Sequence, residues 1–207
     1  MTRAALANSR SLTPKGLATR NRIVAAAGRL ILEHGVESAK LEEIQATANV
    51  SASQLYHYFT DKSDLLLAVI DHQTELVLGI QRPLLENLDS FAALEEWREG
   101  VVASIESMQC VGGCPLGSLV GSLAESDPIA RTALANSFAR WQKLLESGLV
   151  TMRDRGELRA DIDANALALG ILASVQGGLL LSQTRRDSVA VRTALDMSIA
   201  YLSTLRP

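Results

Sequence analysis

The sequence predicts an all-α fold of about nine helices, and three observations support this prediction. Apolar residues recur along most of the chain with the 3.6-residue period of an amphipathic helix. Capping residues and prolines stand at the breaks between these periodic stretches. Aromatic residues make up only 4% of the 207 residues, and all-β folds favour such residues. With 47% hydrophobic residues, the chain can build a core and is not of the disordered class.

Charge is divided unevenly along the chain. Residues 1–63 contain eight Lys or Arg and five Asp or Glu, a net charge of +3. Residues 64–207 contain twelve and eighteen, a net charge of −6. A basic front and an acidic remainder are typical of a protein whose front part meets a polyanion. Two cysteines and three histidines argue against a disulfide scaffold or a zinc framework, and we predict no metal and no cofactor.

The N-terminal stretch, residues 1–16, is predicted to be a flexible basic tail. No apolar run follows its positive residues, as one would in a secretory signal. The first helix is then indicated by an apolar stripe from Ile23 to Ile31, and Gly35 is a common type of helix stop.

Two short helices are predicted next, over residues 41–48 and 52–59. The connection between them is only three residues long, and Asn49 within it tolerates a left-handed backbone better than most residues. Ser51 followed by Gln54 forms a capping box for the second helix. This is the helix-turn-helix arrangement, in which the second helix lies in the major groove of DNA.

The second of these helices offers polar side chains whose amides and hydroxyls can read base edges or hold phosphates, while Leu55 and Phe59 face the core. Lys62 begins the next helix, where its ammonium and backbone N–H groups can meet one phosphate. Lys40 and Arg20 can hold the DNA backbone at the outer edges. The candidate DNA-binding residues of this predicted domain, residues 17–62, are Arg20, Lys40, Ser51, Ala52, Ser53, Gln54, Tyr56, His57, Tyr58 and Lys62.

Plainer interpretations stand beside several of these assignments. Gln54 can complete the capping box and read no base. Tyr56 and Tyr58 can be half-buried aromatic residues with their hydroxyls in water. His57 can be an ordinary solvated residue.

The remaining residues, 63–207, are predicted to form a larger helical domain. Asp61 can cap the helix that begins at Lys62, and Pro115 and Pro128 stand at first helical positions, where proline is favoured. Gly156 ends the longest helix. The helices are predicted over residues 65–88, 91–108, from 115 onward, 128–155, 164–184 and 188–205.

One of these stretches, residues 164–184, contains no charged residue and is long enough to cross a membrane. The polar side chains of Asn165, Ser174, Gln176 and Gln183 make it amphipathic, and no Trp or Tyr belt flanks it. We therefore expect a buried helix at a subunit or domain contact, in a cytoplasmic protein without a membrane partner.

The run Leu55-Tyr56-His57-Tyr58-Phe59-Thr60-Asp61-Lys62-Ser63-Asp64-Leu65, with the helix-turn-helix before it, resembles the TetR family of bacterial transcription regulators. The resemblance covers about 47 residues. It implies a homodimer whose last two helices form a four-helix interface, an effector pocket within the middle helices, and release of DNA when that pocket fills. Three residues depart from the family pattern: Gln45 replaces the usual Ala, Asn49 the usual turn Gly, and Ala52 a frequent Lys or Arg.

The composition of the last two helices independently supports the dimer. Gly170, Gly177 and Gly178 permit close approach of helices, and leucines supply apolar area. Paired reading helices require half-sites about 34–36 Å apart. The alternative is one intramolecular core. The candidate interface residues are Leu169, Leu172, Ala173, Gln176, Gly177, Leu180, Val191, Leu195 and Leu202.

Apolar residues in the middle of the chain are candidates for an effector pocket, since ligand sites are mostly apolar. Ordinary core packing is the alternative for each one. Cys114 precedes the helix start at Pro115, whose amide groups favour a thiolate and lower its pKa, so attack by an oxidant or electrophile at Cys114 is one hypothesis for DNA release. Buried, inert cysteines are the alternative. The candidates are Trp97, Met108, Cys110, Cys114, Leu116, Phe138, Trp141 and Leu145.

The sequence thus predicts a homodimeric DNA-binding repressor, released from double-stranded operator DNA by a small apolar or electrophilic effector. Two rivals stay open: a repressor that needs no ligand, and a helical thiol enzyme that uses Cys114. We predict no enzyme, because His34, His57 and His72 lack the partner spacing of metal or acid–base sites.

Overall fold

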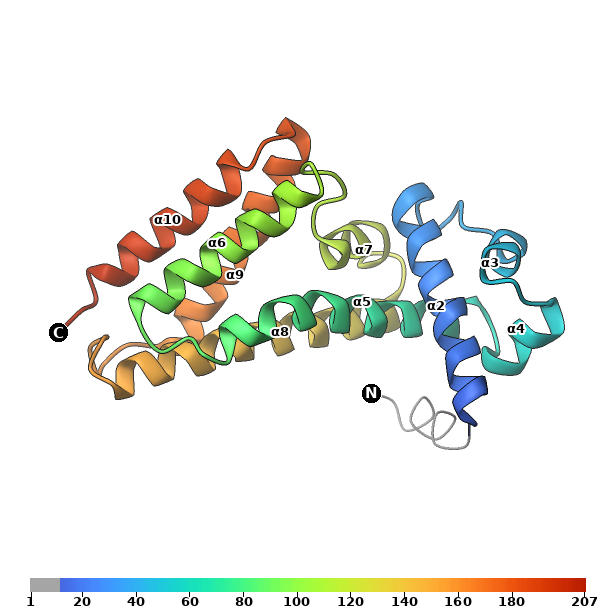
Figure 1. The fold of residues 1–207 in the computed structure, drawn as a ribbon, viewed down its shortest axis with the longest axis horizontal. Helices are drawn as coiled ribbons and strands as arrows, with labels where there is room; N and C mark the ends of the chain where they lie inside the picture. Colours follow the sequence, from blue (N-terminus) through green and yellow to red (C-terminus); the bar gives the residue numbers. More distant parts are fainter. Residues whose placement is uncertain (1–11) are drawn as a thin grey trace. The chain divides into compact units, whose positions relative to one another are not determined.

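The computed structural model describes residues 12–207, which form nine α-helices and no β-strand (Figure 1). This confirms the all-α prediction. Most of the predicted tail lies outside the described residues. The first helix begins earlier than predicted, at Pro14, where the Thr13 hydroxyl accepts a hydrogen bond from the Gly16 N–H at 3.2 Å. The last three residues assigned to the tail are therefore helical.

The other helices begin within three residues of their predicted positions, and those with a predicted end also finish within three residues of it. In chain order the helices are α2 (Pro14–His34), α3 (Leu41–Ala48), α4 (Ala52–Tyr58), α5 (Lys62–Leu85), α6 (Phe91–Ser107), α7 (Pro115–Leu123), α8 (Pro128–Asp154), α9 (Ala164–Arg185) and α10 (Val189–Ser203).

The chain divides into two compact units. The first unit ends at Glu75 and also includes residues Ser118–Ala135, while the second unit comprises Leu76–Gly117 and Asn136–Pro207. The division differs from a single cut after Lys62, because the first part of α5 and a later segment belong with the helix-turn-helix.

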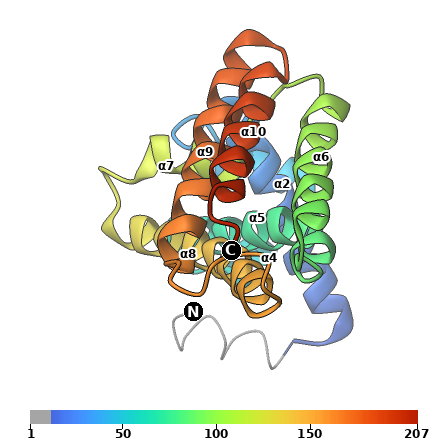
Figure 2. The same ribbon diagram turned by 90° about the vertical axis from the view of Figure 1, so that its left-hand side faces the viewer.

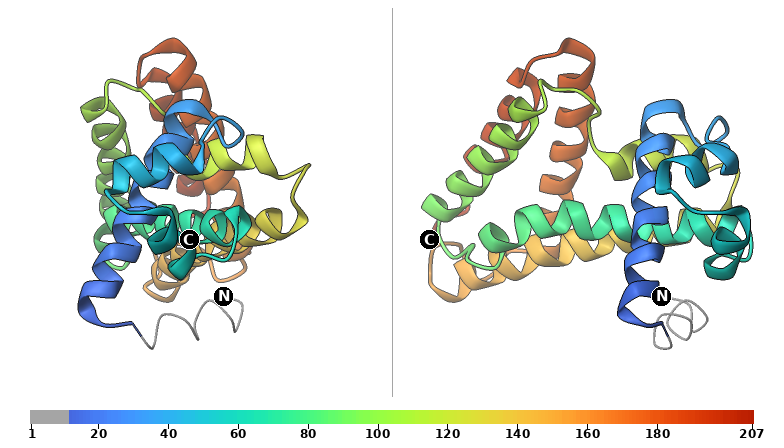
Figure 3. Two further views of the ribbon diagram at one scale, coloured as in Figure 1. Left: turned by 90° about the vertical axis from the view of Figure 1, so that its right-hand side faces the viewer. Right: turned by 45° about the vertical axis from the view of Figure 1, so that its right-hand side comes forward.

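In the first unit, α2 packs against α3, and the two helices of the helix-turn-helix lie on the same side of α2 (Figures 1 and 3). Apolar side chains from every one of these helices are withdrawn from water, which supplies most of the free energy that holds such short helices together. The most deeply buried are Ile23, Ala27, Ile44, Leu55 and Phe59.

In the second unit, α9 and α10 run side by side (Figures 1 and 2). They approach each other closely at Gly178, where a Cβ atom would lie 2.6 Å from the Cα of Val191. The Val191 N–H also donates to the Ser182 hydroxyl at 3.2 Å. A glycine is therefore required at Gly178 by the packing, not by backbone conformation.

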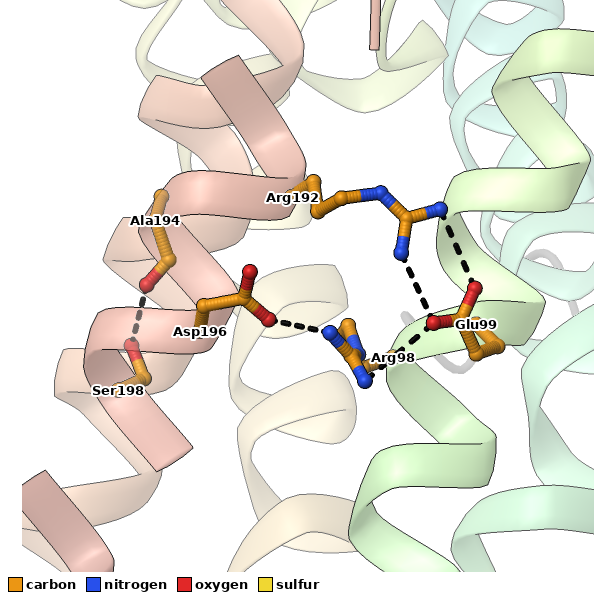
Figure 4. Close-up of polar contacts among 6 residues, drawn as sticks. All are labelled: Arg98, Glu99, Arg192, Ala194, Asp196 and Ser198. Carbon is orange, nitrogen blue, oxygen red and sulfur yellow. Dashed lines mark hydrogen bonds and ion pairs between the residues drawn. The ribbon is translucent and has the colours of Figure 1, made fainter. Parts of the chain in front are cut away.

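The contact of α6 with α10 is polar (Figure 4). Arg192 donates to both carboxylate oxygens of Glu99, at 2.8 and 3.2 Å. Arg98 pairs with Asp196 and, at 3.3 Å, with Glu99. These four side chains are named the α6–α10 seam.

By length and composition, α9 is the one helix among residues 12–207 that could cross a membrane. Core helices of ordinary globular proteins meet the same criterion; 39% of the apolar window of α9 is buried, and α9 packs against α10.

Candidate nucleic-acid interface

The turn between α3 and α4 has the geometry that Asn49 predicts. Asn49 adopts the left-handed conformation, with φ 51° and ψ 57°. The N–H of Asn49 donates to the Ala46 carbonyl at 3.2 Å and the N–H of Val50 to the Gln45 carbonyl at 3.0 Å, so carbonyls at the end of α3 are satisfied within the turn. The chain thereby turns into α4 within three residues.

The start of α4 carries the predicted capping box. The Ser51 hydroxyl accepts from the Gln54 N–H at 3.2 Å, and the Gln54 side-chain oxygen accepts from the Ser51 N–H at 2.9 Å. The plainer interpretation of Gln54 as a capping residue is confirmed. Base reading by Gln54 stays a prediction. The side-chain NH₂ group is the part of the amide that the capping box does not use.

The two faces of α4 differ sharply in exposure. Leu55 and, at the C-cap, Phe59 are each 1% exposed and anchor the helix to the first unit. Tyr56 is 55% exposed. The other outward residues, also exposed, are Ser51, Ala52, Ser53, Gln54 and His57. A polar surface on a firmly seated helix is what a major-groove reader requires.

Tyr58 differs from its neighbours on α4. It is half-buried, its ring meets the His57 ring edge-on at 4.9 Å, and its hydroxyl lies toward Gly16 at the start of α2. This is the packing role that we set against DNA contact for Tyr58.

The basic residues near the helix-turn-helix are used partly inside the unit. The Lys62 ammonium donates to the Val36 carbonyl at 2.9 Å, and the Arg20 guanidinium lies 5.2 Å above the Phe59 ring. Lys40 is exposed at the N-cap of α3. The contact of Lys62 with Val36 could not be predicted from the sequence, because the two residues lie 26 positions apart.

The start of α5 is less open to phosphate than predicted. The Asp64 N–H donates to the Asp61 carboxylate at 2.8 Å, which confirms the predicted cap, and the Thr60 N–H donates to Asp64 at 3.1 Å. Two carboxylates therefore lie beside the place where we expect N–H groups to hold a phosphate. The phosphate contact stays a prediction, and Lys62 remains its candidate side chain.

The predicted effector residues all belong to the second unit. Phe138 stacks on Trp141, with ring centroids 6.5 Å apart. Met108 is 48% exposed at the C-cap of α6, and its part in an effector pocket stays a prediction. The others with less than 10% exposure are Trp97, Cys110, Cys114, Leu116, Trp141 and Leu145.

The environment of Cys114 is the reverse of the one we predicted. Burial raises the pKa of the Cys114 thiol above its ordinary value. Hydrogen bonds with the Gly117 backbone, the Gln176 side chain and the Leu116 backbone lower it, but by less. Removal from water thus outweighs the helix start, and a thiolate is disfavoured.

A cavity of about 730 Å³ lies along α9 and α10. Its lining includes Gly170, Ser174, Met197, Tyr201 and Leu205, and none of the eight predicted effector residues. The cavity is therefore formed by α9, α10 and the segment before α9, and not by the helices that carry the predicted effector residues.

The predicted dimer residues separate into two groups. Leu169 and Leu180 are 55% and 62% exposed, and Ala173 and Gly177 are exposed beside them. Gln176 is half-buried. The other four are at most 4% exposed within this chain, which leaves them little surface for a partner, and their assignment to the interface stays a prediction: Leu172, Val191, Leu195 and Leu202.

Four further large apolar residues on the same helices are exposed and were not among the predicted interface residues. Leu181 and Val189 are each 55%, Met197 70% and Tyr201 59% exposed. The four-residue spacing of Met197 and Tyr201 was the available signal, since it places both on one face of α10.

An all-helical chain with a capped, outward-facing α4 and a second helical unit is a helix-turn-helix transcription regulator. Comparison with known proteins identifies it further. Residues 23–69 match the family model for bacterial regulatory proteins of the tetR family, and residues 91–197 match that of the tetracyclin repressor-like C-terminal domain. The chain belongs to the TetR family of DNA-binding transcription regulators.

Relatives and solved structures agree with this assignment. An uncharacterised HTH-type transcriptional regulator of Lactococcus lactis is 27% identical over 184 residues, covering 86% of this chain and 90% of the relative. The transcriptional repressor BepR of Brucella suis is 28% identical over 180 residues, covering 78% of each chain. A TetR-family regulator structure from Cytophaga hutchinsonii shares the fold, with a TM-score of 0.78 at 16% identity, covering 95% of this chain and 98% of that one.

Proposed function

We propose that the chain is a cytoplasmic homodimeric repressor whose two α4 helices enter successive major grooves of operator DNA. The observation that carries this proposal is the construction of α4: Leu55 and Phe59 are buried, Ser51 and Gln54 cap its start, and the remaining face is polar and exposed. A short helix presented in this way can reach base edges without losing its own support.

The outer faces of α9 and α10 support the dimer. Leu169, Leu180, Leu181, Met197 and Tyr201 are each more than half exposed, although they are large and apolar. Large apolar side chains that gather on neighbouring helices mark interaction surfaces, and two-fold pairing of identical surfaces is the commonest arrangement of soluble oligomers.

The dimer is tested by charging this surface. Met197→Glu should convert a dimer to a monomer in sedimentation equilibrium and should lower DNA affinity, because one reading helix replaces two. Leu76→Glu is the matched control, since Leu76 is likewise a large apolar residue that is exposed, at 49%, but it lies on α5. Equal masses for both variants would contradict the proposed surface.

We further propose that a small apolar effector bound in the second unit releases the DNA. Phe138, Trp141 and the buried leucines nearby in sequence offer the aromatic and apolar groups such a ligand requires. A ligand that binds the DNA-incompetent state more tightly shifts the population toward it.

A ligand-independent repressor is the second candidate, and one observation favours it. Trp97, Leu116, Trp141 and Leu145 are at most 1% exposed, and the cavity along α9 and α10 includes none of them. A thermal-shift screen with apolar compounds, followed by DNA binding with each hit, separates the two. Hits that leave DNA affinity unchanged would favour the ligand-independent version.

The electrophilic version of the effector is tested at the cysteines. The raised pKa of Cys114 disfavours both this version and a thiol enzyme, because each needs the thiolate as nucleophile. We expect N-ethylmaleimide and peroxide to act equally on DNA binding by wild type and by Cys114→Ser. Release that disappears in Cys114→Ser, but not in Cys110→Ser, would restore the electrophilic effector.

DNA binding itself is tested by selecting duplexes from a random pool with the purified chain. We expect a sequence with two related half-sites separated by about one helical turn, or a multiple of it. The Ser53→Ala and Tyr56→Phe variants should change the preferred bases, because their side chains are exposed on α4. Recovery of no preferred sequence would overturn the proposed repressor.

A further inference from the structure

Two basic residues from other helices hold α3 and the loop that precedes it. In that loop, the Lys62 ammonium of α5 donates to the carbonyl of Val36, two residues after α2 ends and five before α3 begins. At the end of α3, Nε of Arg22 from α2 donates at 3.4 Å to the carbonyl of Ala48, the last residue of α3. These two contacts are named the α3 grip.

The Ala48 carbonyl is a suitable place for a cation. The last carbonyls of a helix have no partner within it and carry the negative end of its dipole. Asn49 then turns the backbone away in the left-handed conformation. Arg22 therefore satisfies an acceptor at the point where α3 passes into the turn that carries α4.

The position of α3 depends strongly on such external contacts. An isolated helix of eight residues is unstable in water. Ile44 and Ala48 are its buried residues, which gives it a narrow apolar footing on the unit. Because the turn is only three residues long, a displacement of the end of α3 is passed on to α4.

We propose that Arg22 is a positioning residue for the DNA-reading helix, acting through the Ala48 carbonyl and not through a phosphate. This rests on the assigned DNA-binding function of the first unit. Arg22 gives a cleaner test than Lys62, because Lys62 is also the remaining candidate for a phosphate contact near the start of α5.

Salt dependence distinguishes the two roles. A cation that neutralises a phosphate steepens the dependence of log Kd on log salt by about 0.9, whatever the DNA sequence. A positioning residue lowers affinity for the preferred sequence alone, because non-specific binding does not require base edges to be met accurately.

The decisive comparison is Arg22→Gln against Arg29→Gln. Both changes remove one positive charge from α2, and Arg29 is exposed there outside the grip. The probes are a duplex selected by the wild-type chain from a random pool and an unrelated duplex of equal length, titrated by fluorescence anisotropy over a series of KCl concentrations.

We expect Arg22→Gln to bind the selected duplex about tenfold more weakly than Arg29→Gln, a loss of the size of one base contact. The two variants should have equal salt slopes and equal affinity for the unrelated duplex. A salt slope reduced further in Arg22→Gln would overturn the proposal in favour of a phosphate contact. The proposal would also be overturned if the two variants bound the selected duplex with equal affinity and the unrelated duplex with equal affinity.

Hydrogen exchange without DNA gives an independent measurement. Amides of α3 and of the turn should exchange several-fold faster in Arg22→Gln than in Arg29→Gln, with α2 unchanged, and Arg22→Lys should restore part of the protection because it keeps a donor. Unchanged α3 protection would overturn the grip even if DNA binding is lost. A wild-type chain that selects no duplex would instead contradict the repressor, and exchange would still decide the grip.

Discussion

Helix α10 contacts two neighbours in chemically opposite ways. Toward α9 it presents Val191, Leu195 and Leu202, all at most 1% exposed. Toward α6 it presents Arg192 and Asp196, whose partners are charged and whose side chains remain partly in water. The spacing of these residues along α10 places the apolar and the charged side chains on different faces of the helix. Neighbouring positions such as Val191 and Arg192 therefore make different kinds of contact.

This contrast indicates which contact of the second unit depends on salt and pH. Burial of an apolar side chain contributes about 1.5–3 kcal/mol and does not depend on pH. Partly exposed ion pairs contribute about 0–1 kcal/mol and are screened by salt. We therefore expect the contact between α9 and α10 to keep its stability when salt or pH changes. The attachment of α6 to α10 should weaken with added salt and with acid.

The largest effect is expected from Leu195→Ala. Leu195 is completely buried, and removing a buried leucine side chain costs about 2–5 kcal/mol through lost burial and the cavity that remains. Urea unfolding at neutral pH measures the change, and the same loss should be found at high salt. Thr193→Ala, at an exposed position of α10, serves as the control. A loss below 1 kcal/mol would mean that the α9 face is not the main support of α10.

Gly178→Ala comes next, with an expected loss of about 1–3 kcal/mol from overpacking. The new Cβ would meet the backbone of Val191 at 2.6 Å, and backbone cannot swing aside as a flexible side chain can. Gly79→Ala is the matched control in α5, because its Cβ would meet nothing within 4 Å. That control should stabilise by about 0.5–1 kcal/mol, as alanine is the better helix former. Opposite signs for the two glycines would support close packing of α9 on the α10 backbone at Gly178, and equal signs would contradict it.

The sequence predicted features that neighbouring residues determine. The Ser51–Gln54 box, the Asn49 turn and the helix start at Pro128 each depend on a few adjacent residues, and each was confirmed. It could not predict which leucines of the last two helices face inward, because apolar residues surround α9 on most sides. Val191 and Leu195 form an apolar stripe on α10, and residue spacing alone does not tell whether such a stripe packs within the chain or on a second copy.

Contacts between distant residues were beyond the sequence for a related reason. Arg98 and Asp196 are 98 positions apart, and Arg22 and Ala48 are 26 apart. A charged residue on an amphipathic helix has many possible partners, and only packing selects one. The candidate DNA site was therefore predicted residue by residue, while the internal use of Lys62 and Arg22 was not.

A smaller effect is expected for the ion pair of Arg98 with Asp196. A double-mutant cycle of Arg98→Gln and Asp196→Asn should give a coupling free energy of about 1 kcal/mol or less in unfolding at low salt. The coupling should shrink at high salt, because the Asp196 side chain is 48% exposed. A coupling that salt leaves unchanged would indicate a pair shielded from solvent, and α6 would then be as firmly attached as α9.

The smallest effect is expected from protonation of Glu99. The hydrogen bond from Arg192 is the largest influence on this carboxyl, and together with the charges of Arg192 and Arg98 it holds the pKa of Glu99 below the ordinary value of 4.5. A folded-state pKa lower than the unfolded one contributes stability above about pH 4.5, which is lost as the pH falls through the folded-state value. Wild type should therefore melt slightly higher than Glu99→Gln at neutral pH, and the two melting temperatures should converge in acid. Glu95→Gln, an exposed position of α6 outside the seam, should show no such convergence. A gap between wild type and Glu99→Gln that widens on acidification would have the wrong sign for a carboxylate stabilised by Arg192, and the seam would then not be what holds α6 to α10.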